Sequence, residues 1–382
     1  MGISDIQPLI WEMLVRSISN NRIANAYLFQ GPQGCGKEWA AIEFARSLNC
    51  LQKEKSSCYS CESCVKFSTL QHPELSITVP LPSIKNHSKE SNVIDSLTKD
   101  DYELLINSIN KKSKDPFFKI KIPKSQRILI NSIRDIKKKI YLKSDSNYIK
   151  VFIIFDAHLL SIGGGESANA LLKILEEPPN NSVFILSTDY GHKLLPTIIS
   201  RCQSLNFSKI QLENAEKLLI NMGVKKSSAY EIASFSDGNM HFANRLIGYS
   251  VDSLIGKSEK FVYQITKLSK NNWKSFIDDF SMLAYRKPDE FYLNFYLIQI
   301  WFYYAYRIRN GVSLDSSSMG VFEKKIKEFN SCYPNANFSE INIEIEKVII
   351  SLSQNLNINL MLVNFLISIQ TLLKGKELRE VI

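Results

Sequence analysis

The sequence lacks a hydrophobic run long enough to cross a membrane. Its most apolar stretch, residues 291–306 (FYLNFYLIQIWFYYAY), is shorter than the roughly 20 residues of a spanning helix and contains Asn294 and Gln299. The first residues lack an uninterrupted apolar segment that ends in a small-residue cleavage site, so we expect no secretory signal. These absences predict a cytoplasmic protein with no membrane partner, in which residues 291–306 form a buried helix.

Glycine and proline are also scarce, at 15 and 12 of 382 residues, which excludes fibrous and low-complexity proteins. With 45% hydrophobic and 22% charged residues, the composition is that of a globular protein, and the length predicts two to three domains. The formal net charge of +9 is compatible with a polyanionic partner but does not by itself indicate one.

Disulfides are not expected in a reducing compartment, so a cysteine cluster would indicate a metal. Four of the seven cysteines, Cys50, Cys58, Cys61 and Cys64, follow one another at short spacings, with no histidine among them. Four thiolates at such spacings are typical of a closed tetrahedral zinc site. The alternative is four unrelated buried thiols, but free cysteines usually scatter as single core residues. We therefore predict a structural Zn²⁺ ion held by these four residues.

A glycine-rich loop lies between an apolar segment and a helical pattern. Its sequence, GPQGCGK from 31 to 37, matches seven positions of the phosphate-binding pattern GxxxxGK[ST]. Gly31, Gly34, Gly36 and Lys37 are thus candidate nucleotide-binding residues, because backbone N–H groups and the lysine would meet the phosphates. Glu38 stands where a hydroxyl would bind Mg²⁺, and its charge would repel phosphate. Weak ATP binding and a vestigial loop without ATP are the two alternatives.

Two unbroken apolar runs, 151–155 and 183–187, predict strands that are covered on both faces. The segment 167–177 between them predicts a helix that ends before Pro178. Strands that alternate with helices indicate a parallel α/β sheet.

After residue 207 the alternation ceases and only helical patterns follow. We expect an α/β domain over 1–207, which includes the cysteine module 50–64 and an insertion or long loop at about 76–124. A small helical domain over 208–250 and a helical bundle over 251–382 complete the expected fold.

The end of the first of these strands bears on ATP hydrolysis. A working P-loop enzyme needs an acidic pair there, one carboxylate for Mg²⁺ and one to polarise water. In this sequence Phe155 occupies the probable metal-holding position, and Asp156 is a lone carboxylate that could instead cap a helix. Glu38 and Phe155 alter both magnesium-binding elements, so we predict that the chain does not hydrolyse ATP.

Two basic features allow two interpretations each. Arg201 follows the second strand by a short segment, and could reach phosphates of a neighbouring subunit, although an isolated arginine is more often a salt-bridge partner. The helix predicted over 125–140, which carries Lys137, Lys138 and Lys139, could face DNA, but a solvated helix face is the commoner explanation.

Taken together, these segments resemble the clamp-loader subunits of bacterial DNA polymerase III, which are AAA+ proteins with a P-loop sheet domain, a small helical lid and a helical collar. The matching pieces occur in family order over about 200 residues. They are NAYLFQG (25–31) with the loop to Lys37, LNC (48–50) with the cysteine triplet, HP (72–73), IR (133–134), NALLKILEEPP (169–179) and SRC (200–202).

The family contains gamma/tau subunits, which hydrolyse ATP, and a delta-prime branch with degraded nucleotide motifs. Glu38, Phe155 and His241 replace a threonine, an acidic residue and a nucleotide-sensing arginine of the gamma/tau type, while Arg201 is kept. This pattern resembles the delta-prime branch. The resemblance implies that Arg201 acts as an arginine finger in trans on a neighbouring gamma/tau ATPase.

The resemblance also implies partners: gamma/tau and delta subunits in a hetero-pentameric ring, the sliding clamp, and primer-template DNA. Residues from about 251 onward would form the collar. The alternative within the family is an active gamma/tau-type ATPase in which Glu38 is tolerated. A P-loop signalling protein unrelated to replication is opposed by the cysteine cluster and the SRC segment.

Overall fold

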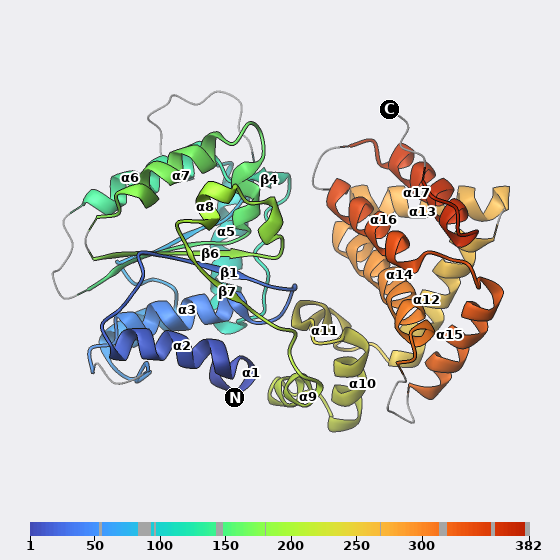
Figure 1. Ribbon diagram of the computed structural model, residues 1–382, viewed down its shortest axis with the longest axis horizontal. Coiled ribbons are helices and arrows are strands. Elements are labelled where there is room, and N and C mark those ends of the chain that lie inside the picture. The colour runs from blue at the N-terminus through green and yellow to red at the C-terminus, as the bar shows by residue number, and fades with distance from the viewer. Residues whose placement is uncertain are drawn as a thin grey trace. The chain divides into compact units, whose positions relative to one another are not determined.

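The structure is a computed structural model (Figure 1), and the residues it describes are 1–52, 56–82, 93–94, 97–142, 148–179, 181–267, 269–312, 319–352 and 356–378. The chain divides into two compact units. The first contains Met1–Asn221 and Asp237–Asn244, and the second contains Met222–Ser236 and Arg245–Ile382. The small helical region expected over 208–250 therefore contributes to both units.

The first unit is built on a five-stranded sheet of order β2-β5-β6-β1-β7, in which all neighbouring strands are parallel. The strands are β1 (Ala26–Gln30), β2 (Leu75–Thr78), β5 (Lys150–Ile154), β6 (Ser182–Thr188) and β7 (Gln203–Asn206). Every residue of β5 and β6 is buried, as the unbroken apolar runs predicted. A short antiparallel pair, β3 (Leu81–Pro82) and β4 (Ser125–Arg127), lies apart from this sheet.

Helices cover both faces of the sheet (Figure 1). On one face α3 contacts β1, β5 and β6, and α1 and α2 pack on α3, whereas α6 and α7 pack together on the other face. The helices of this unit are α1 (Ile3–Ile6), α2 (Pro8–Ser19), α3 (Lys37–Leu48), α4 (Glu62–Ser68), α5 (Lys99–Lys114), α6 (Ile130–Tyr141), α7 (Glu166–Glu176), α8 (Pro196–Ile199) and α9 (Leu212–Asn221), with 3₁₀ turns at Ala157–Ser161 and Gly191–Lys193.

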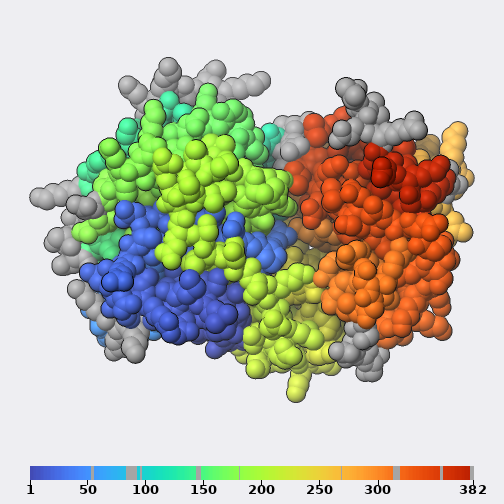
Figure 2. Space-filling view, in the orientation of Figure 1, coloured from blue at the N-terminus to red at the C-terminus, as the bar shows by residue number. Residues whose placement is uncertain are grey.

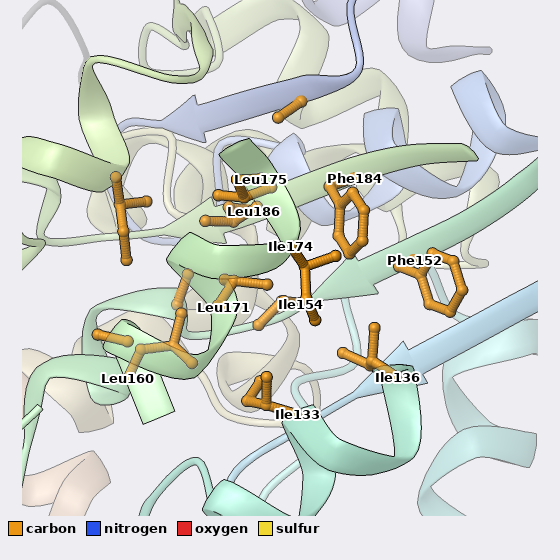
Figure 3. Packing of buried hydrophobic residues seen from close by; sticks show 14 of the residues in the cluster. Ile133, Ile136, Phe152, Ile154, Leu160, Leu171, Ile174, Leu175, Phe184 and Leu186 are labelled. Carbon is orange, nitrogen blue, oxygen red and sulfur yellow. The ribbon is translucent and has the colours of Figure 1, made fainter. Parts of the chain in front are cut away.

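Buried hydrophobic residues fill the space between the sheet and the helices α6 and α7 (Figure 3). Ile133 and Ile136 of α6 and Ile174 of α7 point at the sheet, where they meet Phe152 and Phe184. The two phenyl rings come from adjacent strands and stack with their centroids 5.1 Å apart. Lys137, Lys138 and Lys139 of α6 are exposed, so the helix is amphipathic and packs its apolar face on the sheet.

The stretch 76–124, expected as an insertion or long loop, contains regular structure. Most of β2 lies in it and forms an edge strand of the main sheet, and α5 is a helix of 16 residues. α5 begins where the Thr98 hydroxyl accepts a hydrogen bond from the Asp101 N–H at 3.2 Å. β2 has only two apolar residues and is mostly half-buried, so it carries little of the apolar pattern by which strands are predicted.

Hydrogen bonds connect the N-terminal residues to the segment that follows β7, and the two lie side by side (Figure 2). The Gln7 amide donates to the Ser208 carbonyl at 2.7 Å, and the Asn214 amide donates to the Asp5 carbonyl at 2.8 Å. In the space-filling view the N-terminal residues, in blue, accordingly lie beside the yellow-green segment that follows β7.

The second unit is entirely helical in the part that is described. Its helices are α10 (Lys226–Ser236), α12 (Val251–Thr266), α13 (Lys270–Arg286), α14 (Pro288–Arg309), α15 (Gly320–Cys332), α16 (Phe338–Ser351) and α17 (Ile358–Leu373), and α11 (Met240–Leu246) begins in the first unit. α14 contacts α12, α13, α15 and α16. The expected fold class, a parallel α/β sheet domain followed by helical regions, is confirmed.

The aromatic segment 291–306 lies within α14 and is its buried part, as predicted. Phe291, Phe295 and Phe302 are fully buried, and the rings of Phe291 and Phe295 lie 4.7 Å apart. α10 joins this unit through the Tyr304 hydroxyl, which donates to the Ser234 carbonyl at 2.6 Å. Within the described part of the chain, no helix combines the length and apolarity needed to cross a membrane.

Candidate functional sites

The glycine-rich loop connects β1 to α3, as predicted, and its backbone lies against the segment 239–241. Gly34 and Gly36 have φ values of 72° and 91°, which favour glycine. A Cβ atom at position 34 would lie 2.3 Å from Asn239 Oδ1 and 2.6 Å from the Met240 nitrogen. The Met240 N–H donates to the Gly34 carbonyl at 3.3 Å. The glycines thus permit a close contact between the loop and the segment 239–241.

Lys37 is almost fully buried and is held by the chain itself. Its ammonium group donates to the Pro32 carbonyl at 2.9 Å and forms an ion pair with Asp189, which directly follows β6. Burial alone would raise the pKa of the Asp189 carboxyl, but the nearby Lys119 and Lys37 lower that pKa to about 2. The lysine that would meet terminal phosphates already has an anionic partner.

Glu38 lies in the first turn of α3 and contacts two lysines. One carboxylate oxygen is 2.5 Å from the Lys112 ammonium and the other is 2.7 Å from the Lys119 ammonium. Burial would raise the pKa of Glu38, but Lys112 and Lys119 hold it well below its ordinary value. Glu38 is therefore ionised and paired within the chain.

Asp156 has a different role from the helix cap that the sequence allowed. It precedes the 3₁₀ turn at Ala157–Ser161 with φ 51°, and its side chain makes no capping hydrogen bond. Instead, its carboxylate lies 2.7 Å from the Lys119 ammonium. Burial would lower the pKa of Lys119, but Asp156 and Glu38 raise it well above its ordinary value.

His241, at the position of the expected nucleotide-sensing residue, is bonded to the same neighbourhood. Its Nδ1 donates to the Phe117 carbonyl, and burial lowers the pKa of the ring to about 3, so the ring is neutral. Next to the loop, three cations therefore face three carboxylates: Lys37, Lys112 and Lys119 pair with Glu38, Asp156 and Asp189.

Three of these residues, Lys112, Lys119 and Asp189, were missed by sequence reasoning. Lys112 and Lys119 lie in the stretch taken as an insertion, where no motif marks them, and their partner Glu38 is 74 and 81 residues away. Asp189 could have been noticed as an acidic residue at the end of a buried strand, next to the loop-bearing strand β1.

The four cysteines of the predicted zinc site come together. Cys50 follows α3, Cys58 precedes α4, Cys61 is the N-cap of α4 and Cys64 lies within α4. All four sulfur atoms are within 4.8 Å of one another. The Cys58 and Cys64 sulfurs are 3.9 Å apart, close to the roughly 3.8 Å that tetrahedral bonds of about 2.3 Å to zinc would give. The donor set therefore fits a structural zinc ion.

Backbone N–H groups also point at these sulfurs. The N–H groups of Cys58, Cys61 and Cys64 donate to the sulfurs of Cys50, Cys58 and Cys61 at 3.4, 3.3 and 3.5 Å. Such bonds stabilise negative charge on a thiolate, which is the form that binds a metal.

Arg201 follows α8 and is about one third exposed. Its guanidinium forms a 2.9 Å ion pair with Glu176 at the end of α7 and donates to the Thr197 carbonyl at 2.9 Å. Within this chain it is thus the salt-bridge partner that the plainer interpretation expected, and its described partners are separate from the loop cluster.

The comparisons with known proteins bear on the first unit. A family model described as "DNA polymerase III, delta subunit" matches residues 6–211, more than half of the chain. The chain belongs to this family. The match includes the loop, the four cysteines and Arg201.

Curated relatives agree with this assignment. The chain is 30% identical over 235 residues to DNA polymerase III subunit delta-prime of Bacillus subtilis, covering 62% of this chain and 57% of that protein. It is 29% identical over 255 residues to subunit tau of the same organism, covering 64% of this chain and 36% of tau. The alignments thus span less than two thirds of either relative.

Among solved structures, a gamma subunit-related protein from Thermotoga maritima covers 95% of this chain, and 99% of its own chain is covered, with 16% identity and a TM-score of 0.38.

Proposed function

We propose that the protein is a non-hydrolysing, delta-prime-type subunit of the DNA polymerase III clamp loader. The observation that carries this proposal is the pairing of Lys37 with Asp189 and of Glu38 with two lysines. A site that turns over ATP needs its loop lysine for phosphate and an open position for Mg²⁺. Here Asp189 occupies the loop lysine in place of phosphate, and Glu38 with its two lysines fills the position where Mg²⁺ would bind. This argues against the alternative of an active gamma/tau-type ATPase.

The proposed contribution to catalysis is Arg201, acting on ATP bound to an adjacent gamma/tau subunit. An exposed ion pair such as Arg201–Glu176 contributes about 0–1 kcal/mol, so the guanidinium can exchange Glu176 for a phosphate at little cost. An arginine that stabilises the transferring phosphoryl group can contribute roughly 10³-fold or more in rate at the site that it serves.

The remaining assignments follow the family resemblance. The cysteine module would hold a structural zinc ion, and the helices from about residue 251 would make the collar contacts of the ring. The ring would open the sliding clamp and place it on primer-template DNA. ATP bound to this chain is not required for that role.

The test is steady-state ATP hydrolysis by the purified chain alone and after mixing with gamma/tau, delta, clamp and primed DNA. We expect no turnover by the chain alone, and stimulation in the mixture that Arg201→Ala reduces without loss of assembly. Glu176→Ala is the matched control, because it removes the partner of Arg201 and leaves the guanidinium, so stimulation should persist. Robust turnover by the chain alone would favour the gamma/tau-type alternative.

A further inference from the structure

The segment from the end of α5 to Lys119 enters the neighbourhood of the glycine-rich loop. The Lys112 ammonium contacts Glu38 and also donates to the Pro116 carbonyl at 2.8 Å. The Lys119 ammonium bridges Glu38 and Asp156, at 2.7 Å from each. One cation thus joins the first turn of α3 to the end of β5.

Those two places are where a P-loop protein holds its metal ion. The residue after the loop lysine supplies a hydroxyl to Mg²⁺, and a carboxylate at the end of a neighbouring strand supplies the other protein contact. In this chain Glu38 stands at the first place, and Phe155 occupies the metal-holding position at the second, where the next residue, Asp156, supplies a carboxylate. The Lys119 ammonium lies between the carboxylates of Glu38 and Asp156. Ammonium and Mg²⁺ both favour anionic oxygen partners, so Lys119 can supply the positive charge that the ion would bring.

The same segment also contacts α3 through Trp39, and residues 241–244. The Phe117 carbonyl accepts from His241, and the Phe117 ring packs edge-on against Trp39 at 5.6 Å between centroids. Asp115 accepts a hydrogen bond from the Asn244 amide at 3.0 Å. All of these residues belong to the first unit, so the segment is held from α3, from β5 and from residues 241–244.

We propose that residues 112–119 are an intramolecular plug of the nucleotide site, in which Lys119 substitutes for the metal ion and keeps the site closed to magnesium-nucleotide. This deepens the proposed function, and rests on it only for the premise that the chain needs no nucleotide turnover. Mg·ATP could enter only if Lys119 released both of its carboxylates and Lys37 released Asp189.

Removing the Lys119 charge converts the plug into a metal site. In Lys119→Ala, Glu38 and Asp156 lose their shared cation, and the group of charges next to the loop becomes more negative by one. Mg²⁺ should then occupy the gap, because it prefers carboxylate oxygens, whereas the thiolates of the cysteine cluster are soft ligands that do not suit it.

The experiment is thermal unfolding of the full chain with and without excess Mg²⁺. We expect the midpoint of Lys119→Ala to rise by about 3 °C at roughly ten times the Mg²⁺ dissociation constant. The wild type should not respond, and neither should Lys114→Ala, which removes an exposed lysine at the end of α5, five residues before Lys119. If Lys119→Ala does not fold, Lys119→Met keeps the aliphatic stem and should respond in the same way.

A second measurement titrates a fluorescent ATP analogue with Mg²⁺ into the wild type, where the plug predicts no saturable binding. Saturable binding by the wild type would overturn the proposal. An unfolding midpoint that does not change with Mg²⁺ in the variants without Lys119 would also overturn it. Neither measurement contains a partner subunit. Failure of the plug is therefore distinguishable from failure of the role of Arg201, which is read only in the reconstituted complex.

Discussion

Replacing Glu38 by threonine would restore the P-loop pattern, yet the structure predicts that it destabilises the protein. The side chain of Glu38 is 6% exposed and that of Lys112 is fully buried. In Glu38→Thr, Lys119 keeps Asp156, but Lys112 is left with the Pro116 carbonyl and the face of Phe155 at 5.4 Å.

The expected cost is about 3–5 kcal/mol, because removing one member of a buried ion pair leaves an uncompensated buried charge. A second substitution removes that charge. In the double variant Glu38→Thr/Lys112→Met, about 2 kcal/mol of the lost free energy of unfolding should be regained, since residues in direct contact have coupling energies of this order.

The assay is equilibrium urea unfolding at constant zinc, combined with amide hydrogen exchange of α3 to locate the effect in the first unit. Glu12→Thr is the matched control, because Glu12 belongs to an exposed i,i+4 pair with Arg16 and its loss should change stability by no more than about 0.5 kcal/mol. A cost of less than about 1 kcal/mol for Glu38→Thr would refute the reasoning, as would a double variant less stable than the single one.

Two further predictions concern acid stability and zinc. The pKa of Asp189 is lowered from 3.8 to about 2, so its contribution of about 2 kcal/mol to the free energy of unfolding is complete above pH 4 and is lost as pH falls toward 2. Asp189→Asn should therefore make the free energy of unfolding less dependent on pH over that interval. The same effect in Asp278→Asn, an exposed site on α13, would contradict this assignment. Native mass spectrometry should find one zinc per chain, lost in Cys64→Ser together with exchange protection of α4, but kept in the exposed-site control Cys332→Ser; a purified protein without zinc would count against the metal site.

Local patterns predicted much of the first unit because they depend on neighbours in sequence. The runs at 151–155 and 183–187 are buried strands, and the apolar face of α6 is the one that packs on the sheet. The cysteine cluster could also be predicted from the sequence, since three of its members lie within seven residues, at spacings that fit one metal ion.

The environment of the loop could not be read in the same way. Sequence reasoning found Glu38 and Asp156 as departures from a pattern and treated them separately. Lys119, which joins them, comes from a stretch without a motif, and ion pairs carry no signal when their members are far apart in the chain.

By itself, the sequence therefore determined the fold class, the grouping of the four cysteines, and the presence of Glu38 and Phe155 where a P-loop pattern has a hydroxyl and a carboxylate, because spacing and residue type suffice for each. Only the tertiary structure decided what replaced them. Burial in a folded unit makes an unpaired charge costly, and this cost brings Lys112 and Lys119 to Glu38 across more than 70 residues of chain.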